Sequence, residues 1–432
     1  MRRCWIVMGL SPLVVFLLDV TTCEAQTRPT RMVVVEGKAM RIWSAGMESR
    51  KPGQPVVVLE SGAGAGLDHF KPIFSQVAEH APVFAYDRRG VGQSELDTVP
   101  QTLDRAAQSL HALLREARVP PPYVLVGASY GGIVIRKFGT LFPSEVGGFV
   151  YLDATDTPTR AELAHLPPGA VDAIFNLPPI PGDMPPGLRA EIESIAIGLR
   201  TEFSEARALR TPENVPVAAI IAGAKTWPGI SQSARSGLVN LQITHQSQWT
   251  QTSPRGLLIV ASKARHFLFN DEPELVVDAI NYVVRNAIVN AAGASASATQ
   301  QQTANSPFIG SWSADLSRSR LDSKVPLKGA DITISVTGNI ITLASVVVLP
   351  SGKTIQERET FRADGTETAA TDTTGAFHVA NWVGSHVLAL ITRKGNQNIA
   401  LITYEVSADG QTLTARTAGS VDQMVIFNRR AP

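Results

Sequence analysis

Cysteine is almost absent from this 432-residue sequence, in which Cys4 and Cys23 are the only two. Both lie in an N-terminal segment where a basic start, Met1–Arg3, precedes an apolar run and then small residues. This order is typical of a secretory signal peptide, so we expect residues 1–25 to be removed and the protein to be periplasmic or secreted. The mature chain then has no thiol, which excludes disulfides, a cysteine nucleophile and thiolate metal sites.

Long apolar runs and an excess of one charge are also lacking. The apolar run of the leader stops at Asp19, which is too early for a bilayer span, and no membrane span is expected after the leader is removed. A lipid anchor at Cys23 is an alternative that Thr22 disfavours. Lys and Arg number 39 against 38 Asp and Glu, a net charge of +1, and no basic stripe stands out. We therefore expect no nucleic-acid partner.

The stretch Tyr123–Gly132, with the sequence YVLVGASYGG, is the most informative segment of the chain. Its first residues are apolar, as in a strand buried on both faces, and helical spacing of apolar residues follows it. Ser129 stands at the apex of the turn, where the backbone is strained and where Gly127 and Gly131 have a steric reason to be glycine. A strand, a sharp turn with serine and a helix together predict a nucleophilic serine, and a glycine-rich turn in a parallel sheet is the alternative.

Buried strands alternate with amphipathic helices on both sides of this stretch. Strands are expected at residues 55–59, 82–86, 123–126, 148–152, 215–222 and 256–261. This rhythm predicts an α/β fold, a doubly wound and mostly parallel sheet, in a domain over residues 26–290. Residues 157–214 break the rhythm with prolines, short helices and apolar side chains that need burial, and they are expected to form a helical cap over the carboxyl edge of the sheet.

The last part of the chain has another pattern. Residues 291–307 are of low complexity, small and polar, which predicts a flexible linker. Over residues 308–432 apolar residues alternate with polar ones and Thr and Val are frequent, which predicts an all-β, barrel-like domain. Because the linker has no bulk with which to pack, we expect the two domains to be separable near Asn290.

An activated serine needs a base and an acid that orients the base. His266 follows the last expected strand of the sheet, so its loop can reach Ser129. Asp153 ends the strand after the nucleophile helix, at the same sheet edge, and is the expected acid. Asp156 and Asp271 are the alternatives, of which the first fits the start of the cap and the second fits a helix N-cap.

Other sequence features narrow the choice of acid and indicate an oxyanion hole. No Asp or Glu occurs between Val215 and Asn270, so the loop after the penultimate strand cannot supply the acid. The glycine-rich loop after the first buried strand and the turn at the serine should each give one backbone N–H, from Ala63 and from Tyr130. A merely tight turn is the alternative for that loop. Residues 87–90 are expected to join loops through salt bridges without a catalytic role.

The segments VVVLESGAGAG, YDRRGVGQS, LVGASYGG, VYLDATD and ARHF occur in this order between about Arg31 and Asn290. In these residues the chain resembles the α/β-hydrolase fold superfamily, which implies an esterase, lipase, peptidase or related hydrolase. Ser61 stands where many members have histidine, and an acid at Asp153 is the less common placement. Epoxide hydrolases and dehalogenases need Asp as the nucleophile, and Ser129 argues against both.

The C-terminal domain resembles lipocalin-like or fatty-acid-binding-like barrels in its opening Gly310-x-Trp312. Arg429, after the last expected strand, is expected to pack on Trp312. The pattern does not distinguish a barrel that binds a ligand from a barrel with a filled core and only a scaffolding role.

The sequence thus predicts an exported serine hydrolase that splits small-molecule esters, with an apolar acyl group, through an acyl-enzyme and without metal or cofactor. One alternative is a proline-type aminopeptidase, which needs an acidic cluster in the cap. The cap offers such acids, although a solvated helix face also explains them: Glu191, Glu193, Glu202 and Glu205. The other alternative is a ligand-binding protein with a degenerate hydrolase module.

Overall fold

The computed structural model describes residues 30–97, 99–175, 184–225, 230–253, 255–291, 306–371, 375–395, 397–419, 421 and 423–430. The expected signal peptide and most of the expected linker lie outside these residues. Among the helices described, none is both long and apolar enough to cross a membrane.

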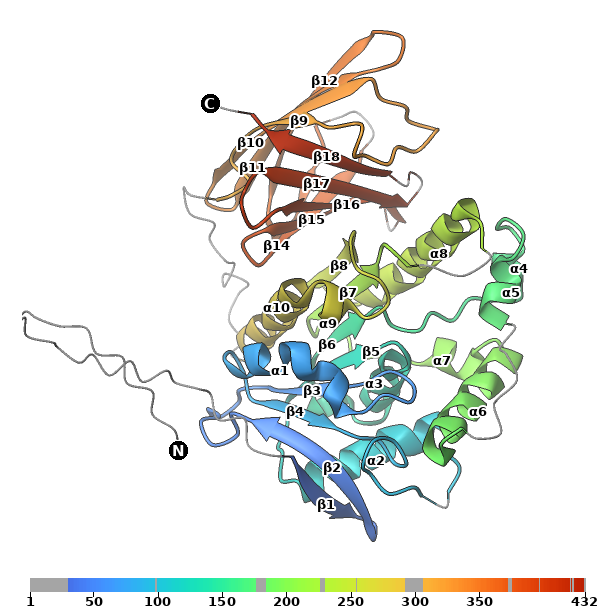
Figure 1. Ribbon diagram of the computed structural model, residues 1–432. Coiled ribbons are helices and arrows are strands. Elements are labelled where there is room, and N and C mark those ends of the chain that lie inside the picture. The colour runs from blue at the N-terminus through green and yellow to red at the C-terminus, as the bar shows by residue number, and fades with distance from the viewer. Residues whose placement is uncertain are drawn as a thin grey trace, which may run out of the picture.

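The first domain is built on an eight-stranded sheet with the order β1-β2-β4-β3-β5-β6-β7-β8 (Figure 1). The strands are β1 Arg31–Val35, β2 Lys38–Ala45, β3 Val56–Glu60, β4 Val83–Tyr86, β5 Tyr123–Ala128, β6 Val146–Leu152, β7 Val217–Ala222 and β8 Gly256–Ala261. Strands β3 to β8 pair in parallel, whereas β2 pairs antiparallel with β1 and β4. The expected mostly parallel α/β sheet is confirmed.

Helices cover both faces of this sheet, because alternate residues of each buried strand point to opposite sides. In β5, Val124 and Val126 belong to the apolar core under one set of helices, and Leu125 belongs to the core under the other. The first set comprises α1 Lys71–Ala78, α9 Leu268–Asp271 and α10 Pro273–Ala291. The second set comprises α2 Leu103–Glu116, α3 Tyr130–Leu141 and α8 Gln232–Thr250.

The described residues between β6 and β7, within the expected cap at 157–214, include four helices. They are α4 Arg160–Leu163, α5 Ala170–Phe175, α6 Pro186–Arg200 and α7 Ser204–Ala208. Their apolar side chains form a separate core with the start of α3, where Tyr130, Ile133 and Val134 contribute. The cap therefore rests on the turn that contains Ser129.

The C-terminal residues form one antiparallel ten-stranded sheet with the order β12-β11-β10-β9-β18-β17-β16-β15-β14-β13. The strands are β9 Gly310–Ala314, β10 Gly329–Thr337, β11 Ile340–Val348, β12 Thr354–Arg362, β13 Asp364–Ala369, β14 Phe377–Val383, β15 Val387–Lys394, β16 Gln397–Val406, β17 Thr412–Gly419 and β18 Gln423–Arg429. The sheet curls into a near-barrel around an apolar core that includes Phe308, Trp312 and Phe427. The expected all-β, barrel-like domain is confirmed, and the guanidinium of Arg429 lies 4.1 Å from the ring centroid of Trp312.

The near-barrel packs on the first domain through its own outer face. In β15, Leu388 and Leu390 point into the barrel core, whereas Val387, Ala389 and Ile391 belong to the two cores of the eight-stranded sheet. Strands β15 and β16 contact the edge strand β8, β17 contacts α8, and β14 contacts α10, as the arrangement in Figure 1 shows.

Polar contacts join the same surfaces. The backbone N–H of Val260 donates to Thr403 Oγ1 at 3.3 Å, and Tyr282 Oη donates to Asn381 Oδ1 at 3.2 Å. Shared buried surface of this kind does not fit the expectation of two separable domains.

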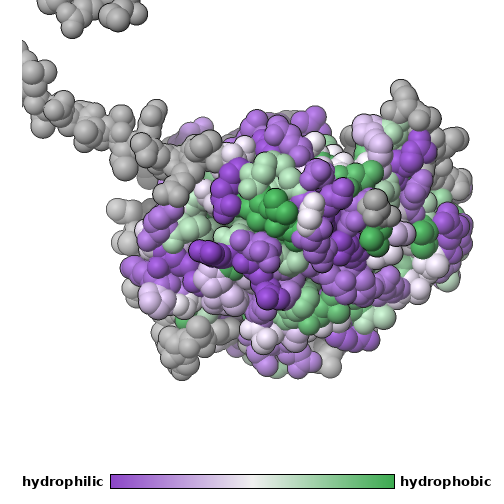
Figure 2. Space-filling view, turned by 90° about the horizontal axis from the view of Figure 1, so that it is seen from below, coloured by the Kyte–Doolittle hydropathy of each residue, from purple (hydrophilic) through white to green (hydrophobic). Residues whose placement is uncertain are grey.

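The face of the molecule seen from below, on the side away from the barrel, shows several separate hydrophobic areas among hydrophilic ones (Figure 2).

Candidate active site

Ser129 lies between β5 and α3 in a backbone conformation that side chains rarely adopt, with φ 51° and ψ −121°. The turn is possible only because its neighbours are glycines. A Cβ on Gly127 would lie 2.6 Å from the carbonyl oxygen of Gly131, and a Cβ on Gly131 would collide with the carbonyl of Glu60. The strain presents the serine side chain at the carboxyl edge of the sheet.

The structure brings Ser129, His266 and Asp153 together. His266 lies in the loop between β8 and α9, and its Nε2 is 3.0 Å from Ser129 Oγ. Its Nδ1 is 2.7 Å from Oδ2 of Asp153, which follows β6 and is 1% exposed. The residues come from three loops that end at one sheet edge, as expected of parallel strands.

Two residues that the sequence reasoning missed hold the other oxygen of Asp153. Lys225 Nζ lies 2.7 Å from Oδ1, and Gln242 Nε2 donates to the same atom at 3.1 Å. Burial alone would raise the pKa of Asp153, but the Lys225 ammonium and the bond to His266 outweigh it and hold that pKa below its ordinary value. The sequence did offer one signal for Lys225: it is a lysine that closely follows β7, in a stretch that contains no acid with which it could pair.

Asp156, the alternative acid, is engaged elsewhere. Its Oδ1 lies 2.8 Å from Nδ1 of His245 on α8, and Nε2 of the same ring lies 2.9 Å from Glu162 Oε1. Although burial lowers the pKa of His245, the two carboxylates outweigh this and raise it to about 9. Asp156 thus anchors the start of the cap to α8. Asp271, expected as a helix N-cap, is the last residue of α9, and its carboxylate accepts the backbone N–H of Arg265 at 2.7 Å.

The loop after β3 lies directly beside the serine. A Cβ on Gly62 would lie 3.3 Å from Ser129 Cβ. Within this loop the N–H of Gly64 donates to Glu191 at 2.5 Å and that of Ala65 donates to Gly62 O at 3.2 Å. Among the described residues, no acceptor is found for the N–H of Ala63, which remains available to a ligand.

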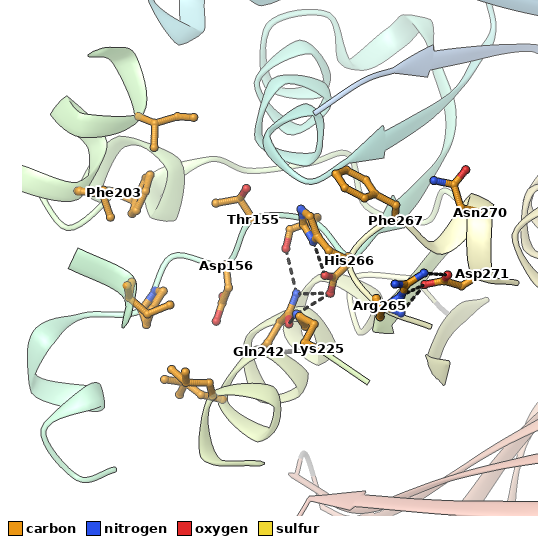
Figure 3. A pocket seen from close by; sticks show the side chains of 18 residues that line it. Thr155, Asp156, Phe203, Lys225, Gln242, Arg265, His266, Phe267, Asn270 and Asp271 are labelled. Carbon is orange, nitrogen blue, oxygen red and sulfur yellow. Dashed lines mark hydrogen bonds and ion pairs between the residues drawn. The ribbon is translucent and has the colours of Figure 1, made fainter. Parts of the chain in front are cut away.

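A cavity of about 630 Å³ lies next to His266, under the cap (Figure 3). Most of its wall is apolar: Ile174, Ile195, Leu199, Phe203, Leu238, Leu241 and Phe267. Figure 3 shows Lys225 and Gln242 beside His266, with Phe203 on the opposite side of the pocket from Arg265 and Asp271. The Arg265 guanidinium is paired with Asp271 at 2.8 Å. In the described part of the chain, no cluster of His, Cys, Asp and Glu suits a metal ion.

Comparison with known proteins places this arrangement in a family. Residues 56–279, more than half of the chain, match the model of the Alpha/beta hydrolase family. The uncharacterized protein YqjL of Bacillus subtilis is 26% identical over 227 residues, which cover 51% of this chain and 79% of that protein. An AB hydrolase superfamily protein of Gibberella zeae is 31% identical over 116 residues, 26% of this chain and only 36% of that protein. The solved epoxide hydrolase VrEH1 from Vigna radiata is 17% identical with a TM-score of 0.43, over 60% of this chain and 97% of that one. The chain belongs to the alpha/beta hydrolase family.

Proposed function

We propose that this protein is an exported serine hydrolase that cleaves carboxylic esters through an acyl-enzyme at Ser129. One observation supports this most strongly: the continuous contact from Ser129 Oγ to His266 Nε2 at 3.0 Å and from His266 Nδ1 to Asp153 at 2.7 Å. A serine hydroxyl is a weak nucleophile on its own, and a base at this distance activates it.

Acylation follows from the geometry. As Ser129 Oγ attacks the ester carbonyl carbon, His266 Nε2 takes the hydroxyl proton, and the buried Asp153 carboxylate stabilises the imidazolium that results. The carbonyl oxygen becomes an oxyanion, which receives hydrogen bonds from the backbone N–H groups of Ala63 and Tyr130. Tyr130 is the first residue of α3, so its N–H has no partner within the helix and the helix dipole also favours the negative charge.

Collapse of the tetrahedral intermediate expels the alcohol, which takes the proton from His266. Water then attacks the acyl carbon with His266 as the base, and the second tetrahedral intermediate collapses: His266 returns the proton to Ser129 Oγ as the carboxylic acid leaves. Every proton moves between substrate, water, Ser129 and His266, so the cycle requires no metal or cofactor.

The pocket supports an apolar, uncharged acyl group. Its wall is largely aliphatic and aromatic, and its charged members have partners: Lys225 with Asp153, Arg265 with Asp271, and Asp156 with His245. An ionic substrate would have to displace one of these ion pairs. A neutral acyl chain gains instead from removal of its surface from water.

The aminopeptidase alternative receives less support. Such an enzyme needs a carboxylate in the cap that is available to the substrate amine. Glu191, a cap acid expected on a solvated face, is 3% exposed and pairs with Arg88 at 2.6 Å. Glu205 pairs with Lys137 at 3.0 Å. Neither glutamate lines the pocket.

An activity test discriminates these possibilities. The full-length mature protein is treated with a fluorophosphonate probe and then assayed on p-nitrophenyl esters from acetate to palmitate and on proline p-nitroanilide. We expect covalent labelling of Ser129 and a clear preference for medium acyl esters over the anilide. Faster cleavage of the anilide than of any ester would favour the aminopeptidase, and absence of both labelling and hydrolysis would favour a binding protein. Detection of the protein in a periplasmic or medium fraction tests export.

Asp153→Asn is expected to lower kcat/KM by about 10³- to 10⁴-fold, because the amide favours the wrong imidazole tautomer. Asp156→Asn is the matched control, since Asp156 contacts His245 and lies three residues away in the same segment. It should change kcat/KM by less than about threefold, because the asparagine side chain can still hydrogen-bond to His245. The measurement is kcat/KM on one ester with circular dichroism as the folding check, and the reverse ranking would assign the acid role to Asp156.

A further inference from the structure

Three charged side chains are buried beside the proposed oxyanion hole: Glu60 at the end of β3, Arg88 after β4 and Glu191 on the cap helix α6. They are 0%, 4% and 3% exposed. Arg88 Nη1 lies 2.5 Å from Glu60 Oε1, and Arg88 Nε lies 2.6 Å from Glu191 Oε1. Burial of charges is costly and such groups add little net stability even when paired, so a role other than stability is the better explanation.

The same guanidinium holds the loop that carries Ala63. Nη1 donates to the carbonyl oxygen of Ser61 and Nη2 donates to that of Gly62, both at 2.6 Å. The peptide unit is planar and trans, so the N–H of Ala63 points opposite to the Gly62 carbonyl in the same unit. A fixed Gly62 carbonyl therefore fixes the direction of the Ala63 N–H, away from Arg88, in a loop that lies against Ser129.

Glu191 holds both the arginine and the next amide of the loop. Its Oε2 accepts the Gly64 N–H at 2.5 Å and lies 2.9 Å from Arg88 Nη2. The peptide units on either side of Ala63 thus have side-chain partners, one from the sheet domain and one from the cap. The Arg88 guanidinium also lies 5.6 Å from the ring centroid of Tyr130, the residue of the second N–H donor.

The first turn of α6 rests on the same loops without any gap. A Cβ on Gly187 would collide with the carbonyl of Gly90, and a Cβ on Gly64 would collide with the side chain of Leu188. The cap helix is therefore in backbone contact with the segment of Arg88, and its Leu188 side chain packs on the loop of Ala63. Loss of this contact would remove one of the two carboxylates that face Arg88.

We propose that Arg88 and Glu191 are positioning residues that aim the Ala63 N–H at the reacting carbonyl, so that the oxyanion hole is complete only while the cap is docked. This inference rests on the proposed ester hydrolysis and makes the cap a part of the catalytic geometry as well as the wall of the acyl pocket. Neither residue touches the substrate in this role.

The test compares Glu191→Ala and Glu191→Gln with Glu193→Gln, an exposed glutamate on the same helix. Loss of one oxyanion donor lowers kcat by about 10²- to 10³-fold, and misalignment should cost part of that. We expect Glu191→Ala to lower kcat by about 10- to 100-fold with KM within about threefold, and Glu191→Gln to be intermediate because it keeps an acceptor for Gly64. Glu193→Gln should match wild type.

The second readout is the Ki of a trifluoromethyl ketone, which forms an oxyanion on the serine, compared with the Ki of the corresponding alcohol, which does not. In the Glu191 variants the Ki of the ketone should rise by the same factor by which kcat/KM falls, whereas the Ki of the alcohol should not change. A purely structural role would weaken both inhibitors alike. If Glu191→Ala does not fold, the isosteric Glu191→Gln decides alone.

The inference is overturned if folded Glu191 variants keep kcat and ketone affinity within twofold of wild type, or if the loss appears in KM only. Failure of the proposed function is a different result, namely a wild-type protein that neither hydrolyses esters nor reacts with the fluorophosphonate probe.

Discussion

Ser129→Ala is expected to abolish ester hydrolysis and fluorophosphonate labelling, with a fall in kcat on the order of 10⁵-fold or more. The reason is chemical: the acyl-enzyme cannot form without Oγ, and water activated by His266 has no site as well placed. The fold should be unchanged, because alanine keeps the Cβ that this turn already accommodates at φ 51° and only the hydrogen bond to His266 is lost.

The assay uses the full-length chain, with initial rates on a p-nitrophenyl ester and in-gel fluorescence after labelling. Ser75→Ala, at an exposed position of α1, is the matched control and should behave as wild type. Thermal melts of both variants should lie within a few degrees of wild type. Retention of more than a few per cent of activity in Ser129→Ala would show that another residue is the nucleophile.

Deletion of residues 292–432 is expected to yield a protein that does not fold stably, contrary to what the composition of the linker suggests. The deletion uncovers the surfaces of β8 and α10 that β14, β15 and β16 now contact. Each apolar side chain returned to water costs about 1.5–3 kcal/mol. A few of them suffice to exceed the stability of a domain, which is only about 5–15 kcal/mol.

The deletion would also remove Glu405, which pairs at 2.5 Å with Lys263 in the loop that contains His266. Solubility, the cooperativity of a thermal melt and activity on a small ester are the measurements. The control is the full-length chain with a protease site inserted between residues 292 and 305. After cleavage its two halves should elute together and stay active. A soluble deletion protein with the melting temperature and rate of the full chain would show that the interface is dispensable.

The sequence was a sufficient guide wherever local sterics decide the structure. Gly127 and Gly131 are required by the turn at Ser129, and the position of His266 after the last buried strand follows from the order of elements. No acid occurs between residues 215 and 270, and this absence favoured Asp153. In the structure, Asp153 Oδ2 lies 2.7 Å from His266 Nδ1.

What sequence reasoning missed depends on contacts between distant segments. Glu191 sits on a helix whose one other acid, Glu193, is exposed, and nothing local reveals that Glu191 is buried against Arg88, 103 residues earlier. The sequence indicated only indirectly that the barrel packs on the first domain. The run from Val387 to Ile391 is apolar on both faces, which a barrel strand with a solvated exterior does not need. The strands β9, β12, β13 and β14 were not predicted, and β12 is charged and largely exposed.

The place of the barrel on β8 also determines when the chain can finish folding as it is synthesised. The first sheet is complete in sequence at Ala261, but β15 and β16, which cover its edge, end only at Lys394 and Val406. Until those residues have emerged, β8 presents an open strand edge, the kind of surface on which separate chains associate. A nascent chain therefore passes through an aggregation-prone stage of more than a hundred residues. A chaperone that delays folding until release would protect it.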